Sequence, residues 1–338
     1  MLMRPPAFWQ TDAGRGSAAL TRALLTPLGA AYAWATQWRI ETTDPENVYI
    51  PVICVGNLTL GGTGKTPIVR ALLAMLEAAG HHPAALSRGW KGRLDGPAKV
   101  DPETHSVRDV GDEPLLLAQD HAAWIAKHRV AGARAIEAAG HDCIVMDDGH
   151  QNPTLHKDLS LVVVDGETGW GAGRIFPAGP LREPVERGLA RADAVVVMMP
   201  DAGSEPDYVR LSLADLEVPV LRAWLEPAGP PPAGPLLAFA GIGRPQKFYD
   251  ALAAAGGEIA ETASFPDHHA FNARELARLA DLAEAHRATL VTTEKDWVRL
   301  PQEWRARIPA WPVAARFASP DRMSGLLSMA VDGSSGQG

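Results

Sequence analysis

Residues 54–68 read CVGNLTLGGTGKTPI, and this stretch decides the fold. An apolar strand leads into a glycine-rich turn, after which Gly64, Lys65 and Thr66 open a helix. Proteins hold nucleotide phosphates in this way, because the backbone amides of the turn face the phosphate oxygens and the positive end of the helix dipole points at the anion. The stretch therefore predicts a phosphate-binding loop and a protein that handles a nucleoside triphosphate.

The residues of this loop are expected to surround the phosphates, with the lysine ammonium on the terminal phosphates and the last hydroxyl on Mg²⁺. They are Gly61, Gly62, Thr63, Gly64, Lys65 and Thr66. One position departs from the usual G-x-x-x-x-G-K-[ST] spacing, since Thr59 stands where the first glycine is expected. The flanks support the loop all the same, because residues 47–55 are strand-like and residues 67–80 carry apolar side chains at helical spacing.

The composition is that of an ordinary globular chain, with 338 residues of which 46% are hydrophobic and 21% charged. A formal charge of −8 argues against a nucleic-acid partner, which requires a basic face. Two cysteines are too few for a disulfide framework and indicate a reducing compartment.

Apolar runs of strand length recur along the chain and lack the alternation of half-exposed strands. They are residues 83–87, 143–147, 159–165, 194–199 and 219–225. Strands buried on both faces have this pattern, so we expect an α/β fold with a mostly parallel sheet flanked by helices, as in P-loop NTPases.

The chain is expected to divide into five parts, because EPAGPPPAGP interrupts it with more prolines and glycines than a packed element tolerates. They are an N-terminal helical segment (1–45), a P-loop core (46–225), a connector (226–235), a second, smaller α/β domain (236–320) and a disordered tail (321–338). A strand expected at 312–317 is assigned to the smaller domain.

The N-terminal segment contains an uncharged stretch, residues 23–38, between Arg22 and Arg39. It is too short to cross a bilayer, which takes about 20 apolar residues. A secretory signal is disfavoured because it would export the nucleotide-binding domain away from ATP. Two interpretations remain open from the residues alone: a helix packed on the core, or a membrane-interfacial helix to which Phe8 and Trp9 add.

Acidic residues follow one of the apolar strands. In CIVMDDG (143–149), Asp147 and Asp148 stand where a P-loop protein places the carboxylate that holds Mg²⁺. By itself an Asp-Asp-Gly after a strand is commonly a turn. Together with Lys65 and Thr66, it predicts a magnesium site.

Two further segments offer groups for proton transfer. VGDEP places Asp112 and Glu113 ahead of a helix, where acidic residues also suit the helix dipole. FPDHHAF places His268 between a strand and a helix, and no further ligand at suitable spacing supports a zinc site there. The pattern does not establish whether these segments meet.

Loops after strands carry residues suited to phosphate groups or to stacking, since open parallel sheets bind ligands at that edge. They are Arg88, Trp90, Arg182 and Glu183. Lys295 and Asp296 are adjacent, without the gap of a guanine-reading motif, so ATP is favoured over GTP.

Taken together, the motifs stand in the order and spacing of the tetraacyldisaccharide 4′-kinase family, which the chain resembles from Phe8 to about residue 317. The segments that carry the resemblance are GNLTLGGTGKTP, SRGW, VGDEP, MDDGHQ, FPAGPLREP, FAGIG, FPDHH and TTEKD. In three positions the chain differs from the commonest pattern of the family: Trp90 replaces a tyrosine, and His150 and Asn152 replace an aromatic residue and a histidine.

The resemblance implies an ATP- and Mg²⁺-dependent kinase that phosphorylates the 4′-hydroxyl of a tetraacyl disaccharide 1-phosphate lipid during lipid A biosynthesis. It implies a peripheral protein at the cytoplasmic face of the bacterial inner membrane, with an interfacial N-terminal helix and two strands that connect the domains. It also implies an acid–base pair of Asp112 and His268, with Lys65 as a third catalytic residue and substrate contacts that include Glu113. The alternatives are a P-loop GTPase and a soluble small-molecule kinase.

Overall fold

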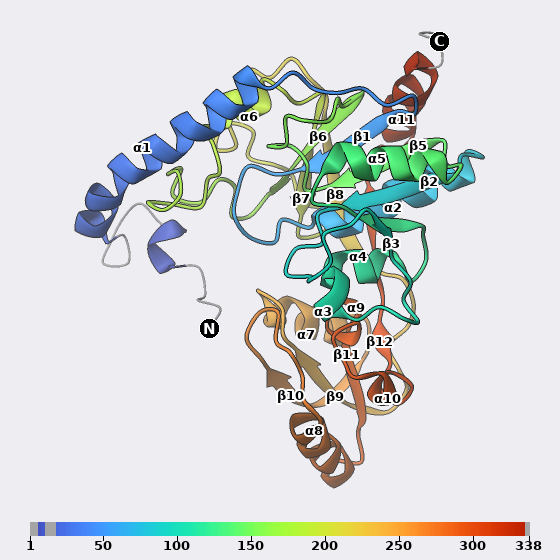
Figure 1. The fold of residues 1–338 in the computed structure, drawn as a ribbon. Helices are drawn as coiled ribbons and strands as arrows, with labels where there is room; N and C mark the ends of the chain where they lie inside the picture. Colours follow the sequence, from blue (N-terminus) through green and yellow to red (C-terminus); the bar gives the residue numbers. More distant parts are fainter. Residues whose placement is uncertain (1–5, 11–17, 335–338) are drawn as a thin grey trace.

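The apolar runs of the sequence form the inner strands of one large sheet. In the computed structural model, which describes residues 6–10 and 18–334, this sheet has nine strands in the order β13-β8-β7-β6-β1-β5-β2-β4-β3 (Figure 1). The strands are β1 (Val52–Gly56), β2 (Pro83–Ser87), β3 (Ala98–Lys99), β4 (Ala123–Ile125), β5 (Cys143–Asp147), β6 (Leu159–Asp165), β7 (Ala194–Met199), β8 (Val220–Pro227) and β13 (Val313–Phe317). Only the outermost pairs, β3–β4 and β13–β8, are antiparallel.

Helices cover both faces of this sheet, which confirms the predicted fold class. The helices of this unit are α2 (Lys65–Ala78), α3 (Val107–Val110), α4 (Asp112–Leu117), α5 (Arg129–Ala138), α6 (Val185–Leu189) and α11 (Pro320–Ser334). Along β1, Ile53 and Val55 point into the core shared with α2 and α11, whereas Val52 and Cys54 pack with α5. Strands β1, β2, β5, β6 and β7 are therefore buried on both faces, as their lack of alternation predicts. Strand β8 is an exception, because its residues alternate between buried and more exposed positions.

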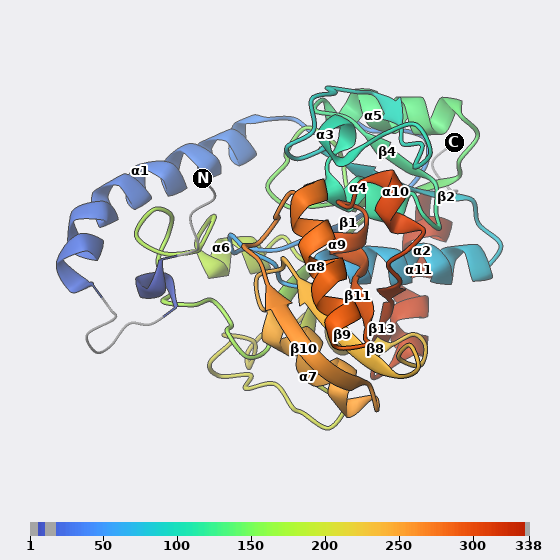
Figure 2. The same cartoon turned by 90° about the horizontal axis from the view of Figure 1, so that it is seen from below.

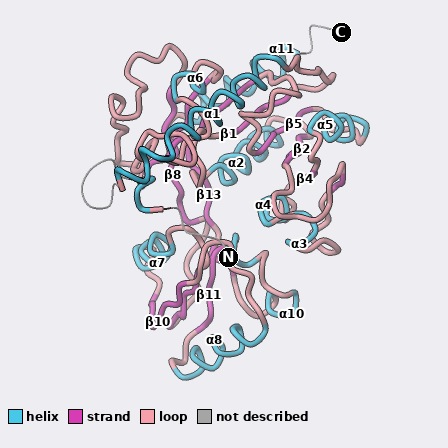
Figure 3. Tube along the Cα trace, turned by 60° about the vertical axis from the view of Figure 1, so that its left-hand side comes forward, coloured by secondary structure: helices cyan, strands magenta, loops and turns pink. Residues whose placement is uncertain are grey.

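A smaller unit is built on a second sheet of four parallel strands in the order β10-β9-β11-β12. Its elements are β9 (Pro235–Ala240), α7 (Pro245–Ala254), β10 (Glu258–Ser264), α8 (Ala273–Ala285), β11 (Thr289–Thr293), α9 (Glu294–Trp297), α10 (Gln302–Arg305) and β12 (Ala310–Trp311). The chain leaves the large sheet along β8 and returns along β13, and Figure 3 shows these two strands side by side. Two paired strands thus connect the units.

Two predictions about the C-terminal part are wrong. Strand β13, expected in the smaller domain, pairs with β8 and belongs to the large sheet. The expected disordered tail is helix α11, and residues 335–338 lie outside the described part. The sequence contains the reason, because Met323, Leu327 and Val331 are buried at helical spacing, a pattern that the glycines and serines around them obscure.

The N-terminal segment is a short 3₁₀ helix, η1 (Ala7–Trp9), and a long helix, α1 (Ala19–Thr42), which extends beyond the predicted stretch at both ends. Residues 1–5 and 11–17 of the expected segment 1–45 lie outside the described residues. Helix α1 lies along the outside of the large unit in both Figure 1 and Figure 2. In the described part of the chain, no helix has the length and apolar content needed to cross a membrane.

Candidate active site

The phosphate-binding loop joins β1 to α2 and has open space beside its glycines. Gly61 and Gly64 have positive φ values of 131° and 84°, which favour glycine. A Cβ atom added to Gly61 or Gly62 would meet no atom within 4 Å, so space for an anion adjoins the loop. No side chain caps the amide end of α2 at Gly64, so its first amides remain available to that anion.

Thr59 needs no glycine conformation, which explains the departure from the usual motif. It forms an isolated antiparallel bridge with Leu181, and its carbonyl accepts hydrogen bonds from Asn57 and Arg182. The buried Asn57 also donates to Thr63 Oγ1 at 3.2 Å. The first half of the loop is therefore held by extended pairing and side-chain bonds.

Lys65, Asp148 and Arg182 meet at the mouth of this loop. Lys65 Nζ lies 3.4 Å from Asp148 Oδ1, and the Arg182 guanidinium donates to both Asp148 oxygens at 2.8 and 3.1 Å. Burial raises the pKa of Asp148, but the charges of Lys65 and Arg182 lower it by more, to well below its usual range. Asp148 thus remains a carboxylate between two cations that suit phosphate groups.

Asp147 ends β5 and is only 1% exposed, and both of its carboxylate oxygens lack a hydrogen-bond partner. Burial and the charge of Glu113 raise the pKa of Asp147 to about 8, against the attraction of Lys65. A buried carboxylate without partners is costly, and a bound cation would remove the cost. The carboxylate of Asp147 therefore fits a bound Mg²⁺. No cluster of three or more metal-binding side chains occurs among residues 6–10 and 18–334.

The structure brings together the two groups that the sequence could not connect. Asp112 is the first residue of α4 in the large unit, and His268 precedes α8 in the smaller one. His268 Nδ1 lies 2.8 Å from Asp112 Oδ2, across a sequence separation of 156 residues. Helices α4 and α9 lie side by side in Figure 1 and Figure 2, so the two units meet here.

Asp112 is held as a carboxylate. Burial raises its pKa, but the hydrogen bond with His268 and the charges of Lys295 and Arg299 lower that pKa by more than burial raises it. The net result is a pKa well below the usual range of an aspartate. The charge of Glu113, the next residue, acts on Asp147. Glu113, the neighbour of Asp112 in the chain, thus lies within electrostatic reach of Asp147.

The neighbouring His269 has a different environment and bonds to Glu275 Oε2 at 3.0 Å within the smaller unit. Its ring also packs between Phe265 and Phe271, at centroid distances of 4.9 Å from each. His269 therefore packs on aromatic side chains of the smaller unit and does not face Asp112.

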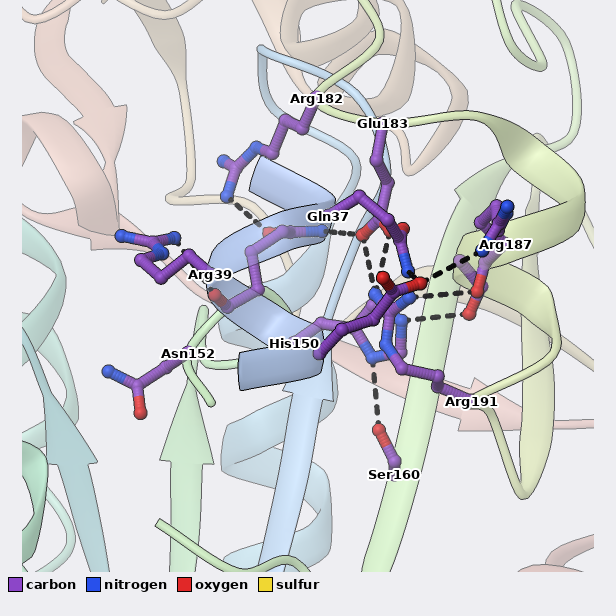
Figure 4. A network of polar contacts seen from close by, with 12 residues as sticks. Gln37, Arg39, His150, Asn152, Ser160, Arg182, Glu183, Arg187 and Arg191 are labelled. Atoms are coloured by element: carbon purple, nitrogen blue, oxygen red, sulfur yellow. Dashed lines mark hydrogen bonds and ion pairs between the residues drawn. The ribbon is translucent and has the colours of Figure 1, made fainter. Parts of the chain in front are cut away.

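Among the remaining predicted substrate or phosphate contacts, some side chains are exposed and others are already hydrogen-bonded within the protein. Arg88 and Trp90 are exposed in the loop after β2, and 59% of Trp90 is accessible. Glu183 is only 1% exposed and pairs with Arg191 through both oxygens, while Gln151 donates to it at 2.9 Å (Figure 4). Its side chain therefore supports the loop that carries Arg182.

His150 and Asn152, which differ from the commonest family pattern, make hydrogen bonds that support the local fold. His150 is buried, and its ring nitrogens contact Ser160 Oγ at 3.0 Å and the Gly188 carbonyl at 2.9 Å (Figure 4). Burial and the charge of Arg191 lower the pKa of His150 to about 4. Asn152 Oδ1 accepts bonds from Thr154 and closes a turn.

Two residues near Asp112 were missed by sequence reasoning. Arg299 donates to Asp112 Oδ2 through Nε at 3.0 Å and also through Nη2. Lys91, in the loop that also holds Trp90, has Asp112 and Asp267 among the charges that act on it. Neither stands in a recognisable motif, and only the meeting of the two units makes them neighbours.

Comparison with known proteins gives a consistent result. A family model described as tetraacyldisaccharide-1-P 4′-kinase matches residues 21–331. A tetraacyldisaccharide 4′-kinase of Maricaulis maris is 62% identical over 98% of this chain and 97% of its own, and one of Caulobacter vibrioides is 53% identical over 97% and 98%. A crystal structure of LpxK from Aquifex aeolicus in complex with ATP superposes with a TM-score of 0.73 at 25% identity, covering 92% of this chain and 99% of the other.

Proposed function

Because the chain belongs to the tetraacyldisaccharide-1-phosphate 4′-kinase family and is therefore an ATP-dependent phosphotransferase, we propose that it transfers the γ-phosphate of ATP to the 4′-hydroxyl of a tetraacyl disaccharide 1-phosphate lipid. The observations that support this assignment best are the contact between Asp112 and His268 and the open space at the phosphate loop. A phosphoryl donor and an alcohol acceptor require those two halves.

The loop side binds and neutralises the nucleotide. Backbone amides of Gly61 to Lys65 surround the phosphates, and the Lys65 ammonium moves from Asp148 to the terminal phosphate oxygens. Arg182 supplies a second cation on the same side. This side therefore lowers the barrier by charge stabilisation and positioning, which dominate phosphoryl transfer.

A magnesium ion bound by Thr66, Asp147 and Asp148 would neutralise charge on the phosphates. Asp147 is the ligand that the structure supports most directly, because its buried oxygens have no other partner. Asp148 would be a further ligand once its contacts with both Lys65 and Arg182 were loosened.

The acceptor side handles the proton. The 4′-oxygen forms a bond to the γ-phosphorus as the bond from that phosphorus to the β–γ bridging oxygen breaks, and the hydroxyl proton passes to Asp112. In a loose transition state the acceptor hydroxyl loses its proton late in the transfer, so a strong base is not needed. A carboxylate with a low pKa is therefore sufficient. His268 orients the carboxylate and shares the proton.

We further propose that α1 lies at the membrane surface, at the cytoplasmic face of the inner membrane. Large apolar side chains of α1 are exposed, at Leu20, Leu24, Leu28, Trp34 and Trp38. The rings of Trp34 and Trp38 stack at 6.3 Å, and such aromatic side chains favour the headgroup region. An acceptor with four acyl chains would then reach the site without leaving the bilayer.

Vesicle flotation tests this placement. Trp34→Ser/Trp38→Ser is expected to reduce binding to phosphatidylethanolamine–phosphatidylglycerol vesicles by about tenfold. Tyr49→Ser removes an aromatic residue that is 93% exposed outside α1 and serves as the control. Equal binding of both variants and the unchanged protein would contradict an interfacial α1.

The activity itself is tested by transfer of labelled γ-phosphate to a tetraacyl disaccharide 1-phosphate, with ATP and GTP compared. We expect a product labelled at the 4′-oxygen, with ATP preferred. Release of label only as inorganic phosphate, at the same rate with and without lipid, would point instead to a nucleotide switch.

A further inference from the structure

Arg299 lies in the turn after α9, and only 3% of its side chain is exposed. Besides its two bonds to Asp112, its Nη1 donates to the Gly241 carbonyl at 3.0 Å and to Asp296 Oδ1 at 2.9 Å. All three guanidinium nitrogens therefore have an oxygen acceptor. This arrangement uses the planar fork of arginine, which a lysine cannot reproduce.

The smaller unit fixes this guanidinium by itself. Asp296 is fully buried, and its Oδ2 accepts from the Gly241 amide at 3.0 Å and from Thr293 Oγ1 at 2.7 Å. The Gly241 carbonyl also accepts from the amide of His268 at 3.0 Å. Arg299 and His268 thus share one anchor, and they approach Asp112 as a preformed pair.

The bonds from this pair fall on one oxygen of Asp112. His268 Nδ1 and both Arg299 donors contact Oδ2, and none of these bonds is made to Oδ1. The backbone before Asp112 is also restrained, because Gly111 has φ 90° and an added Cβ would lie 2.5 Å from the Trp90 carbonyl. The Asp112 side chain is therefore restrained at its backbone and at Oδ2, whereas Oδ1 remains for another partner.

We propose that Arg299 is a positioning residue for phosphoryl transfer: it holds Asp112 Oδ2 so that Oδ1 accepts the proton of the acceptor hydroxyl. The inference rests on the proposed role of Asp112 and adds the residue that makes this role depend on contact between the two units. When the units separate, Asp112 loses Arg299 and His268 together.

The positioning predicts a signature in the pH profile. The cations and the histidine that act on Asp112 are Arg299, Lys295 and His268 from the smaller unit and Lys91 from the loop after β2. The carboxylates nearest to them are Asp267, 3.9 Å from His268 Nε2, and Asp296, which bonds to Arg299. Without Arg299, the remaining cations offset the effect of burial on the pKa of Asp112 less completely. The pKa therefore rises, and the carboxylate becomes protonated at a higher pH than in the unchanged protein. A purely structural arginine would leave the acid limb of the rate profile in place.

The test measures kcat and its pH dependence for Arg299→Met in the full-length protein with saturating Mg-ATP and tetraacyl disaccharide 1-phosphate. We expect kcat to fall about 100-fold with a KM for ATP within about twofold, since a displaced base costs rate and not nucleotide binding. If an acid limb of kcat is seen, we expect it at higher pH in Arg299→Met than in the unchanged protein. Arg305→Met, a half-buried arginine that bonds to backbone carbonyls in the same unit, is expected to retain the rate.

A second variant covers the case in which Arg299→Met does not fold. Arg299→Lys keeps the charge without the fork, so we expect a partial loss of kcat and an acid limb close to that of the unchanged protein. Wild-type kcat in Arg299→Lys, or wild-type kcat in a folded Arg299→Met, would overturn the proposal.

Asp112→Asn separates this failure from failure of the proposed function. If Asp112→Asn is inactive while Arg299→Met is fully active, only the role of Arg299 is wrong. If Asp112→Asn keeps its rate, the acid–base assignment falls and the inference with it. In a double-mutant cycle, we expect Arg299→Met to have little further effect in the Asp112→Asn background.

Discussion

The phosphate side of the site and its acid–base side are assembled in different ways. On the phosphate side, Lys65 and Asp148 follow β1 and β5, which are neighbouring parallel strands of one sheet. On the acid–base side, Asp112 meets His268 and Arg299 across separations of 156 and 187 residues and across two units. One side is fixed by sheet topology, whereas the other exists only while the units are in contact.

This difference has a functional consequence. The phosphate side lies within one unit and is expected to bind nucleotide whatever the smaller unit does. The acid–base side is expected to form and separate with movement of the smaller unit on the paired strands β8 and β13. Variants of the two sides should therefore affect nucleotide binding and turnover differently.

The largest effect is expected for Lys65→Ala on the phosphate side. The loss of the ammonium should lower kcat/KM by about three orders of magnitude or more and weaken ATP binding, because both the ground state and the transition state lose a charge. Steady-state kinetics and calorimetric titration of ATP measure the two effects. Lys99→Ala, at an exposed position of β3, is the control, and equal kinetics for both variants would contradict the phosphate-loop assignment.

A somewhat smaller effect is expected for Asp147→Asn, which tests the magnesium site. The amide keeps the size of the side chain but loses the charge, so we expect a loss of about 100-fold at low Mg²⁺ that higher Mg²⁺ partly restores. Rates measured over a magnesium titration give the answer. An unchanged magnesium dependence would remove Asp147 from the metal site.

On the acid–base side, His268→Gln is expected to lower kcat by about 10- to 100-fold with little change in ATP affinity. Arg299 still holds Asp112 in this variant, which limits the loss. His269→Gln alters the adjacent residue, which contacts Glu275 instead, and is the matched control. If His269→Gln reduced kcat more than His268→Gln, the wrong histidine would have been assigned.

The smallest effect concerns stability and involves neither side directly. The pKa of His150 falls from 6.5 to about 4 on folding, so between these values the unfolded chain binds a proton that the folded chain does not. The free energy of unfolding should therefore decrease as the pH falls from 6.5 to 4, by roughly 1–3 kcal/mol from this residue.

Denaturant titrations of the unchanged protein and of His150→Gln at pH 7 and pH 4.5 measure this contribution. The variant should show a weaker pH dependence, while His156→Gln, whose side chain is 51% exposed, should not. If the free energy of unfolding of His150→Gln and that of the unchanged protein changed equally between pH 7 and pH 4.5, the result would contradict a neutral, buried His150.

The same comparison explains what the sequence could and could not predict. The strands around the phosphate loop are continuous apolar runs, and the parallel-sheet rule places the ends of β1 and β5 together, so Lys65 and Asp148 could be paired in advance. Arg299 stands in no motif, and its partner Asp112 belongs to another unit. Only its position in space reveals it.

The C-terminal errors have a related cause. Strand β13 carries the same kind of short apolar run as a strand of the smaller unit, and nothing local shows that it returns to the large sheet. Helix α11 is weakly patterned and is stabilised by tertiary packing of Met323, Leu327 and Val331 on the core. The local sequence pattern therefore predicts β13 and α11 less well than it predicts the buried strands of the large sheet.

The most direct test of the two-sided site is the single-turnover rate of γ-phosphate transfer by Asp112→Asn, measured together with its dissociation constant for ATP. We expect a transfer rate at least about 100-fold below that of the unchanged protein and an ATP dissociation constant within about twofold. A near-normal transfer rate, or a loss of ATP binding that accounts for the whole effect, would contradict an acid–base side built on Asp112.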